Sequence, residues 1–269
     1  MNNIAQALTI AGSDSGGGAG IQADLKTFQM RGVFGTVAIT AVTAQNTQGV
    51  FDIAPIPLAT ISAQIKAVAE DFDIQAVKIG MLGNAEIIQC VAENLEQYQF
   101  PQIVLDPVMI AKGGASLLQQ DAVAALKQYI LPKATVITPN LPEAEALTGI
   151  KVMDDASAEK AARLLQQWGV ETVVIKGGHS GNSQSAVCLD WVFTPTDRFT
   201  LQAKRFPTPH THGTGCTFSA CITAELAKGN SVEQAIRTAK AYITAAISHP
   251  LNIGHGHGPT NHWAYQDEK

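Results

Sequence analysis

Charged and aromatic residues are scarce in this chain of 269 residues, since 15% are Asp, Glu, Lys or Arg and 6% are Phe, Trp or Tyr. An average soluble domain carries roughly 25% charged residues. The low charged fraction, beside 46% hydrophobic residues, excludes a disordered chain, which needs high charge and few apolar residues. A chain of this length can bury a core without disulfide bonds.

Long apolar runs and basic clusters are also missing. No stretch reaches the roughly 20 uncharged apolar residues that a membrane span needs. The 18 Lys and Arg residues are scattered and the formal net charge is −5, which argues against a nucleic-acid partner. The first residues, 1–4, lack the basic and apolar segments of a secretion signal. We therefore expect a cytoplasmic protein that binds neither membranes nor nucleic acids.

Cysteine is rare, and the four cysteines have no regular spacing. They are Cys90, Cys188, Cys216 and Cys221. Their number and spacing fit neither a disulfide framework nor a zinc site.

Short apolar runs alternate along the chain with longer Ala-rich runs. The expected strands are Ala7–Ala11, Thr36–Thr43, Ala76–Ile79, Ile103–Leu105, Thr135–Thr138 and Thr172–Ile175. The expected helices are Ile21–Met30, Leu58–Glu70, Ala85–Tyr98, Asp121–Tyr129, Ser157–Trp168, Thr217–Lys228 and Val232–Ser248. Strands that are apolar throughout and alternate with helices predict an α/β fold, in which a mostly parallel sheet is covered by helices on both faces.

Two segments late in the chain break this alternation. Ala186–Phe193 and Arg198–Lys204 predict a small antiparallel hairpin at the sheet edge. No linker, repeat or low-complexity stretch divides the chain, so we expect a single domain over residues 1–269.

Glycine gathers where the first expected strand ends. Residues 12–20 contain five glycines and precede a helix, so backbone amides could approach a ligand there. A P-loop is excluded because no Lys follows the last glycine, and the match of Gly18, Gly20 and Ala23 to a dinucleotide fingerprint lacks the acidic residue after the second strand. A purely structural glycine turn stays open as the alternative.

A second glycine cluster, residues 212–216, directly precedes another helix. Unpaired amides and the helix dipole converge at such a start and can hold an anion. Cys216 would lie in the first turn, where the dipole lowers the pKa of a thiol and favours the thiolate. The alternative is an inert buried cysteine.

Polar residues follow the middle strands. Asp106, Asn140 and Glu143 could orient Mg²⁺ and its waters, since this ion prefers oxygen ligands. Asn140 and Glu143 fit equally well as the N-cap and capping-box partner of a helix. Lys176 ends a strand before two glycines and suits a phosphate contact, although an ordinary solvated lysine is the alternative.

Seven segments, spread over residues 11 to about 260, occur in the same order as in a known family. They are residues 11–24, Thr40–Thr47, Lys78–Met81, Asp106–Met109, Thr138–Glu143, Lys176–His179 and His212–Cys216. Together they resemble the ribokinase-like superfamily and, within it, the hydroxymethylpyrimidine/phosphomethylpyrimidine kinase family of thiamine biosynthesis.

The resemblance implies a ribokinase-like three-layer sandwich and an ATP-dependent kinase. The implied reaction phosphorylates 4-amino-5-hydroxymethyl-2-methylpyrimidine to its monophosphate and then to the diphosphate, with Mg²⁺ and commonly as a homodimer. Cys216 stands where most of the superfamily has an Asp base, which argues against sugar and nucleoside kinases.

The resemblance also implies roles for the site residues. The amides of Gly213, Thr214, Gly215 and Cys216 would hold the γ-phosphate, and the Cys216 thiolate would accept the hydroxyl proton. The residues implied for ATP are Lys176, Asn140 and Thr214, and those implied for Mg²⁺ are Asp106, Asn140 and Glu143.

For the pyrimidine, Gln45 offers a donor and an acceptor that match a ring nitrogen beside an amino group. The other implied pocket residues are Gly12, Ala19, Asp24, Met81 and Val108. Asp24 would accept from the amino group, although it also fits one face of a helix.

A pyridoxal kinase of the same branch and, more distantly, a non-catalytic pyrimidine sensor stay as alternatives. The tail histidines His255, His257 and His262 lack zinc-site spacing, so we expect a loop near the dimer contact or the pocket mouth.

Overall fold

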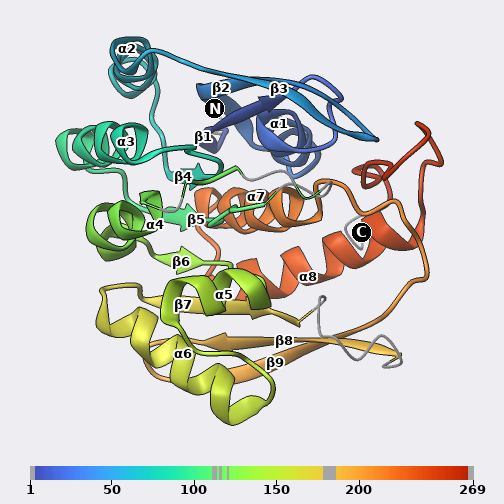
Figure 1. The fold of residues 1–269 in the computed structure, drawn as a ribbon. Helices are drawn as coiled ribbons and strands as arrows, with labels where there is room; N and C mark the ends of the chain where they lie inside the picture. Colours follow the sequence, from blue (N-terminus) through green and yellow to red (C-terminus); the bar gives the residue numbers. More distant parts are fainter. Residues whose placement is uncertain (1–3, 111–113, 115–116, 120, 178–185, 266–269) are drawn as a thin grey trace.

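The structure is a computed structural model that describes residues 4–110, 114, 117–119, 121–177 and 186–265. The nine strands of these described residues form one sheet in the order β3-β2-β1-β4-β5-β6-β7-β8-β9 (Figure 1). The strands are β1 (Gln6–Asp14), β2 (Phe34–Asn46), β3 (Gly49–Pro55), β4 (Ala76–Ile79), β5 (Ile103–Leu105), β6 (Val136–Ile137), β7 (Thr172–Lys176), β8 (Val187–Phe193) and β9 (Arg198–Lys204).

Six strands, from β2 to β7, pair in parallel, as the sequence predicts. The predicted antiparallel hairpin is confirmed as β8 and β9 at one edge. The opposite edge carries β3, which pairs antiparallel with β2 and was not predicted. Phe51, Asp52 and Ala54 of β3 are exposed, so this strand lacks the continuous apolar run by which the buried strands were recognised.

The described residues form eight α-helices in two layers. The helices are α1 (Gly20–Met30), α2 (Leu58–Ala69), α3 (Ala85–Tyr98), α4 (Ala122–Ala125), α5 (Leu141–Thr148), α6 (Asp155–Gln167), α7 (Thr214–Ala227) and α8 (Val232–Ser248). Helices α2 to α6 contribute to one apolar cluster and α1, α7 and α8 to the other. The predicted three-layer sandwich is therefore confirmed.

The central strands are buried on both faces. In β7, Val173 and Ile175 belong to the cluster beneath α2 to α6, whereas Val174 belongs to the cluster beneath α7 and α8. Side chains alternate across a strand, so a strand between two helical layers must be apolar throughout. One sheet runs through all the described strands, which supports the inference of a single domain.

Two predicted helices differ from the observed ones in type or by more than two residues at one end. The helix expected over Asp121–Tyr129 is α4 followed by a π-helical turn, Leu126–Ile130, and a 3₁₀ turn, Leu131–Lys133. Pro132 lies at the start of that last turn, where its missing amide costs no helical hydrogen bond. Helix α7 begins at Thr214, three residues earlier than expected.

The topology concentrates the loops that follow the strands. The chain runs outward from β1 through β2 to β3 and then returns to β4 on the other side of β1. The strand order therefore reverses at β1, and a crevice forms there at the carboxyl ends of the strands. Within the described part of the chain, no helix has the length and apolar character that a membrane crossing needs.

Candidate active site

A cavity of about 900 Å³ opens where the parallel strands end. It is lined by nearly all the residues to which the sequence assigns a role: Gly12, Ala19, Gln45, Met81, Asp106, Val108, Asn140, Glu143, Lys176, Gly213, Thr214, Gly215 and Cys216. The two glycine clusters, 200 residues apart in the chain, therefore share one wall. The exception is Asp24.

The two glycine clusters touch through their backbones. Gly213 is the N-cap of α7 and has a φ of +81°. A Cβ at Gly213 would overlap the carbonyl group of Gly18. Only glycine fits this approach, so the start of α7 is fixed against the loop that follows β1.

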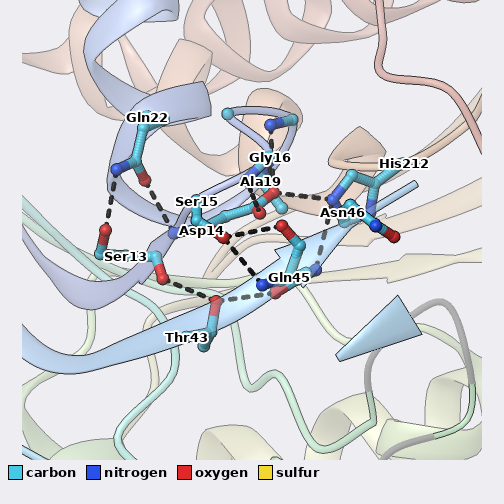
Figure 2. A network of polar contacts seen from close by, with 12 residues as sticks. Ser13, Asp14, Ser15, Gly16, Ala19, Gln22, Thr43, Gln45, Asn46 and His212 are labelled. Atoms are coloured by element: carbon cyan, nitrogen blue, oxygen red, sulfur yellow. Dashed lines mark hydrogen bonds and ion pairs between the residues drawn. The ribbon is translucent and has the colours of Figure 1, made fainter. Parts of the chain in front are cut away.

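Asp14 organises that loop (Figure 2). Its carboxylate accepts hydrogen bonds from the amides of Gly16, Gly18 and Ala19 at 2.8, 3.0 and 2.8 Å. The Nε2 atom of His212, which is buried, lies 2.8 Å from the same carboxylate. Burial would raise the pKa of Asp14, but the hydrogen bond and charge of His212 and the loop amides hold it below its ordinary value. Asp14 therefore links the two glycine clusters as a carboxylate.

Gln45 lies beside this network at the end of β2 (Figure 2). Its Oε1 atom accepts from Thr43 Oγ1 at 3.1 Å, and its Nε2 atom lies 3.4 Å from His212 Nε2. His212 Nε2 must carry a proton to bond the carboxylate of Asp14, so it has no lone pair to accept from Gln45. The Gln45 amide protons therefore stay available to a ligand in the cavity.

Cys216 lies half-buried in the first turn of α7. Burial raises the pKa of its thiol to about 11, opposed by the charge of Lys78 and an amide hydrogen bond from Gly20, and assisted by the charges of Asp24 and Asp106. The expectation of a lowered thiol pKa is therefore wrong for the protein without bound substrates. The thiol is protonated at neutral pH.

Asp106 pairs with the cation expected to contact phosphate. Its Oδ1 atom accepts from Lys176 Nζ at 3.0 Å and from Thr138 Oγ1 at 3.2 Å. Its Oδ2 atom is buried and has no hydrogen-bond partner among the described residues, and a Cβ at Gly215 would lie 3.2 Å from it. Lys176 is thus an ion-paired residue of the cavity wall and not a solvated lysine.

Asn140 and Glu143 form the capping box of α5. Asn140 Oδ1 accepts from the Glu143 amide at 2.9 Å, and Glu143 Oε2 accepts from the Asn140 amide at 2.8 Å. Burial raises the pKa of Glu143 to about 7, although Lys176 opposes the shift. The helix-capping alternative is therefore confirmed, while both residues still line the cavity.

Asp24 lies behind the cavity wall. It is fully buried, and its two oxygens each lie 2.9 Å from Lys78 Nζ, while Thr9 Oγ1 donates to Oδ2 at 2.6 Å. The structure therefore does not bring Asp24 to the place expected for the pyrimidine. Lys78 lines the cavity instead.

Several residues of the wall were not found from the sequence. Asp14, Thr43, Lys78 and His212 belong to quoted segments but had no assigned role. A lysine inside the otherwise apolar strand β4 was a signal of a buried charge. At another part of the wall, β8, β9 and α8 contribute Cys188, Ala203, Ile243 and Ile247, for which no local motif exists.

The tail returns to the cavity. The amide of His257 donates to the Thr47 carbonyl at 2.7 Å, and His257 lines the cavity, so the expected loop at the pocket mouth is confirmed there. Residues 4–110, 114, 117–119, 121–177 and 186–265 hold no group of three or more His, Cys, Asp or Glu suited to a metal ion. Gly178 and His179, from the segment that begins at Lys176, lie outside the described residues.

Comparison with known sequences gives the same assignment along the chain. The family model described as phosphomethylpyrimidine kinase matches residues 14–261. Over 266 residues the chain is 71% identical to the hydroxymethylpyrimidine/phosphomethylpyrimidine kinase of Haemophilus influenzae, covering 98% of this chain and 99% of that protein. It is 47% identical over 257 residues to the thiamine biosynthesis bifunctional protein ThiED of Geobacter sulfurreducens, covering 95% of this chain and 51% of that one.

Solved structures are similar over nearly the whole fold. The pyridoxal kinase from Staphylococcus aureus in complex with AMP-PCP and pyridoxal superposes with a TM-score of 0.89 at 36% identity, covering 98% of this chain and 96% of that one. The phosphomethylpyrimidine kinase from Clostridium difficile superposes with a TM-score of 0.80 at 43% identity, covering 90% of this chain and 99% of that one.

Proposed function

The chain belongs to the phosphomethylpyrimidine kinase family, and on that premise we propose how its cavity performs the two phosphorylations of this family in thiamine biosynthesis. The first transfers phosphate from ATP to the hydroxymethyl group of 4-amino-5-hydroxymethyl-2-methylpyrimidine, and the second converts the monophosphate to the diphosphate. The observation that carries the proposal is one cavity lined by both Gln45 and the start of α7.

The pyrimidine binds between Gln45 and the loop after β1. The available amide protons of Gln45 donate to a ring nitrogen, and Met81 and Val108 pack against the ring. Gly12 leaves room for this ring, since a Cβ there would lie 3.0 Å from Met81 Sδ. The hydroxymethyl group then points to Cys216.

Phosphoryl transfer relies on positioning and charge stabilisation because its transition state is loose. The amides of Gly213, Thr214, Gly215 and Cys216 hold the γ-phosphate as negative charge spreads over its oxygens. The close approach of Gly213 to Gly18 keeps these amides in place before the substrates arrive.

Cys216 accepts the proton of the hydroxymethyl group as the thiolate, after the proton of its thiol has passed to solvent. A thiol whose pKa is about 11 is rarely ionised at neutral pH, but its thiolate is a stronger base than that of an ordinary cysteine. In a loose transition state the proton leaves late, so a base that acts late is sufficient.

Mg²⁺ fits beside Asp106. The buried Oδ2 atom without a partner is the hard oxygen donor that this ion prefers, and Mg²⁺ commonly uses one or two carboxylates together with substrate phosphates and water. Bound there, the ion would neutralise phosphate charge. Asn140 and Glu143 would hold its waters, and Lys176, Asn140 and Thr214 would contact the phosphates of ATP.

The rest of the nucleotide lies along the apolar part of the wall. Ala203, Ile243 and Ile247 line the cavity there and offer the surface that a purine ring buries favourably. The solved kinase from Staphylococcus aureus that binds AMP-PCP supports the use of ATP.

The product mass tests the proposal. Incubation with the hydroxymethylpyrimidine, ATP and Mg²⁺ is expected to give first the monophosphate and then the diphosphate. Absence of both products, in protein shown to be folded, would reject the proposed function. Omission of Mg²⁺ is the control for the metal.

Pyridoxal is the second candidate substrate, because solved relatives at 36% to 41% identity are pyridoxal kinases. Both substrates carry a hydroxymethyl group on an aromatic nitrogen ring. Comparison of kcat/KM for the two decides between them, and we expect the pyrimidine to be preferred and to be the one that proceeds to a diphosphate.

We propose a homodimer that pairs through β2 and β3. Val42 of β2 and Phe51 of the edge strand β3 are 45% and 69% exposed, and exposed apolar groups at a sheet edge favour association. Replacing Phe51 with Asp is expected to shift the mass in sedimentation towards the monomer. A wild-type monomer would reject this arrangement.

Cytoplasmic location stays a prediction, which cell fractionation tests.

A further inference from the structure

A charged side chain in the cavity wall has no part in the steps above. Lys78 belongs to β4, is fully buried and lines the cavity. Its ammonium group bonds both oxygens of Asp24 at 2.9 Å. A buried ion pair contributes little net stability compared with apolar residues of similar volume. Stability therefore does not explain the presence of this ion pair at the cavity, and a functional role is indicated.

Helix α1 connects this ion pair to Cys216. Gly20, the first residue of α1, donates its amide to the Cys216 thiol. Asp24 lies one helical turn later on the same helix and holds Lys78. The element that supplies an amide to the sulfur therefore also fixes the ammonium group.

The ammonium group has room near the end of β4. A Cβ at Gly80 would lie 2.9 Å from Lys78 Nζ, so the glycine leaves that space to the cation. Asp24 and no other acceptor among the described residues bonds Lys78. An ammonium group carries three protons, which leaves one beyond the two contacts with Asp24.

We propose that Lys78 is a positioning residue for the phosphoryl transfer: held in place by Asp24, its ammonium group stabilises the thiolate of Cys216. The inference rests on the proposed role of Cys216 as proton acceptor. The charge of Lys78 lowers the pKa of the thiol, and Cys216 in turn helps to keep the pKa of Lys78 above its ordinary value. Lys78 is therefore charged at the pH of the reaction.

Other charged groups also face Cys216. Asp24 on α1 and Asp106 after β5 oppose the thiolate, and Lys176 on β7 interacts with it favourably. Asp24 has two opposite effects, since it fixes the cation and partly cancels its charge. We therefore expect the pKa of the Cys216 thiol to fall when the charge of Asp24 alone is removed, and to rise when the charges of both Asp24 and Lys78 are removed.

Alkylation of Cys216 by iodoacetamide, followed by peptide mass spectrometry over a range of pH, measures the thiolate directly. Below its pKa, the alkylation rate of a thiol changes about tenfold for each unit of pKa. Asp24→Asn leaves the Lys78 charge uncancelled and is expected to speed alkylation about tenfold. Lys78→Met combined with Asp24→Asn removes both charges of the ion pair and is expected to slow it about tenfold.

Cys188 is the internal control because it lines the same cavity on β8. Its alkylation rate should not change, which separates an electrostatic effect from altered access. Equal alkylation of Cys216 in the wild type and the double variant would overturn the proposal, as would a change of the same sign in both variants. If Asp24→Asn does not fold, the double variant alone decides.

Turnover separates this inference from the proposed role of Cys216. Opposite shifts in alkylation with matching shifts in the pH profile of kcat support both. Opposite shifts in alkylation with an unaltered pH profile support the stabilisation of the thiolate by Lys78 and reject Cys216 as the proton acceptor.

Discussion

At Cys216, the start of a helix and burial act on the thiol in opposite directions. A helix N-terminus is worth about 0.3–1 kcal/mol at an exposed site, less than one unit of pKa at about 1.4 kcal/mol. The pKa is raised from 9.0 to about 11, so burial outweighs the dipole. The start of α7 therefore contributes more to binding phosphate than to stabilising the thiolate. Among the groups that lower the pKa of the thiol, Lys78 has the largest effect.

Replacing Cys216 with Ala tests its chemical role. Loss of the proton acceptor is expected to lower kcat about a hundredfold and to leave the affinity for the pyrimidine almost unchanged, because the ring is bound elsewhere. Steady-state kinetics measure both constants. Turnover close to that of the wild type would remove Cys216 from the role of base.

Replacing Gln45 with Ala tests recognition of the ring. Because the side-chain amide bonds the substrate both before and during the transfer, KM should rise more than kcat falls. Gln48→Ala is the matched control, since Gln48 is exposed in the turn between β2 and β3. An unchanged KM in Gln45→Ala would mean that the pyrimidine binds elsewhere.

At the scale of elements, the junction between α7 and the loop after β1 depends on one glycine. A Cβ at Gly213 would overlap the Gly18 carbonyl, so Gly213→Ala should displace the start of α7 and lower kcat at least about tenfold. Gly229→Ala is the control at the other end of α7. Gly229 has a similar φ of +84° but open space around it, so it reports backbone strain alone. An equal loss of kcat in the two variants would show that backbone strain, and not the junction, matters.

The sequence predicts the buried elements well. The ranges expected for β4 and β5 are those observed, because strands covered on both faces must be apolar throughout. Strand β3 was not predicted because Phe51 and Ala54 are exposed and its pairing with β2 is the feature that defines it. The start of α7 was predicted too late because Thr214 and Gly215 belong to a glycine-rich segment that is unfavourable for a helix.

The site was predictable where its residues are neighbours in the chain. Residues 12–20 and 212–216 each bring several amides to one point, so glycine content alone reveals them. Pairing between distant residues leaves no such signal. Asp14 and His212 are 198 positions apart and Asp24 and Lys78 are 54 apart, and only the folded sheet brings them together. The resemblance implies a pyrimidine contact for Asp24, whereas its partner in the structure is Lys78.

For the whole molecule, the docked C-terminal segment predicts how stability depends on pH. His262 is buried, its Nε2 atom lies 3.0 Å from Thr217 Oγ1 on α7, and Tyr242 donates to its carbonyl at 2.8 Å. Burial lowers the pKa of His262 to about 4 from 6.5. The folded state therefore binds fewer protons than the unfolded state between these values, and the free energy of unfolding falls as the pH drops below about 6.5.

Urea unfolding at about pH 7.5 and about pH 5 measures this effect. The wild type should lose about 2 kcal/mol between them through His262, and His262→Gln should lose less. His255→Gln, in the exposed part of the same tail, is the control and should behave as the wild type. An equal loss in His262→Gln would assign the pH dependence to other groups.

Strand β2 extends beyond the end of its pairing with β1. Its pairing with β1 ends at Thr43, and the backbone ladder of residues 44–46 continues on the β3 side, with a register shift between Ala44 and Gln45. The backbone ladder of the segment that presents Gln45 is thus two-stranded, and the Ser15 hydroxyl links this segment to the loop after β1 by hydrogen bonds with the backbone amide and carbonyl of Gln45 at 2.8 and 2.7 Å. A two-stranded ribbon is only marginally stable by itself. A pyrimidine that binds Gln45 should therefore also stabilise the pairing of β2 with β3. None of the described residues of β3 lines the cavity. Amide hydrogen exchange in β3 should nevertheless slow when the pyrimidine binds, so the edge strand reports binding at a site that it does not contact.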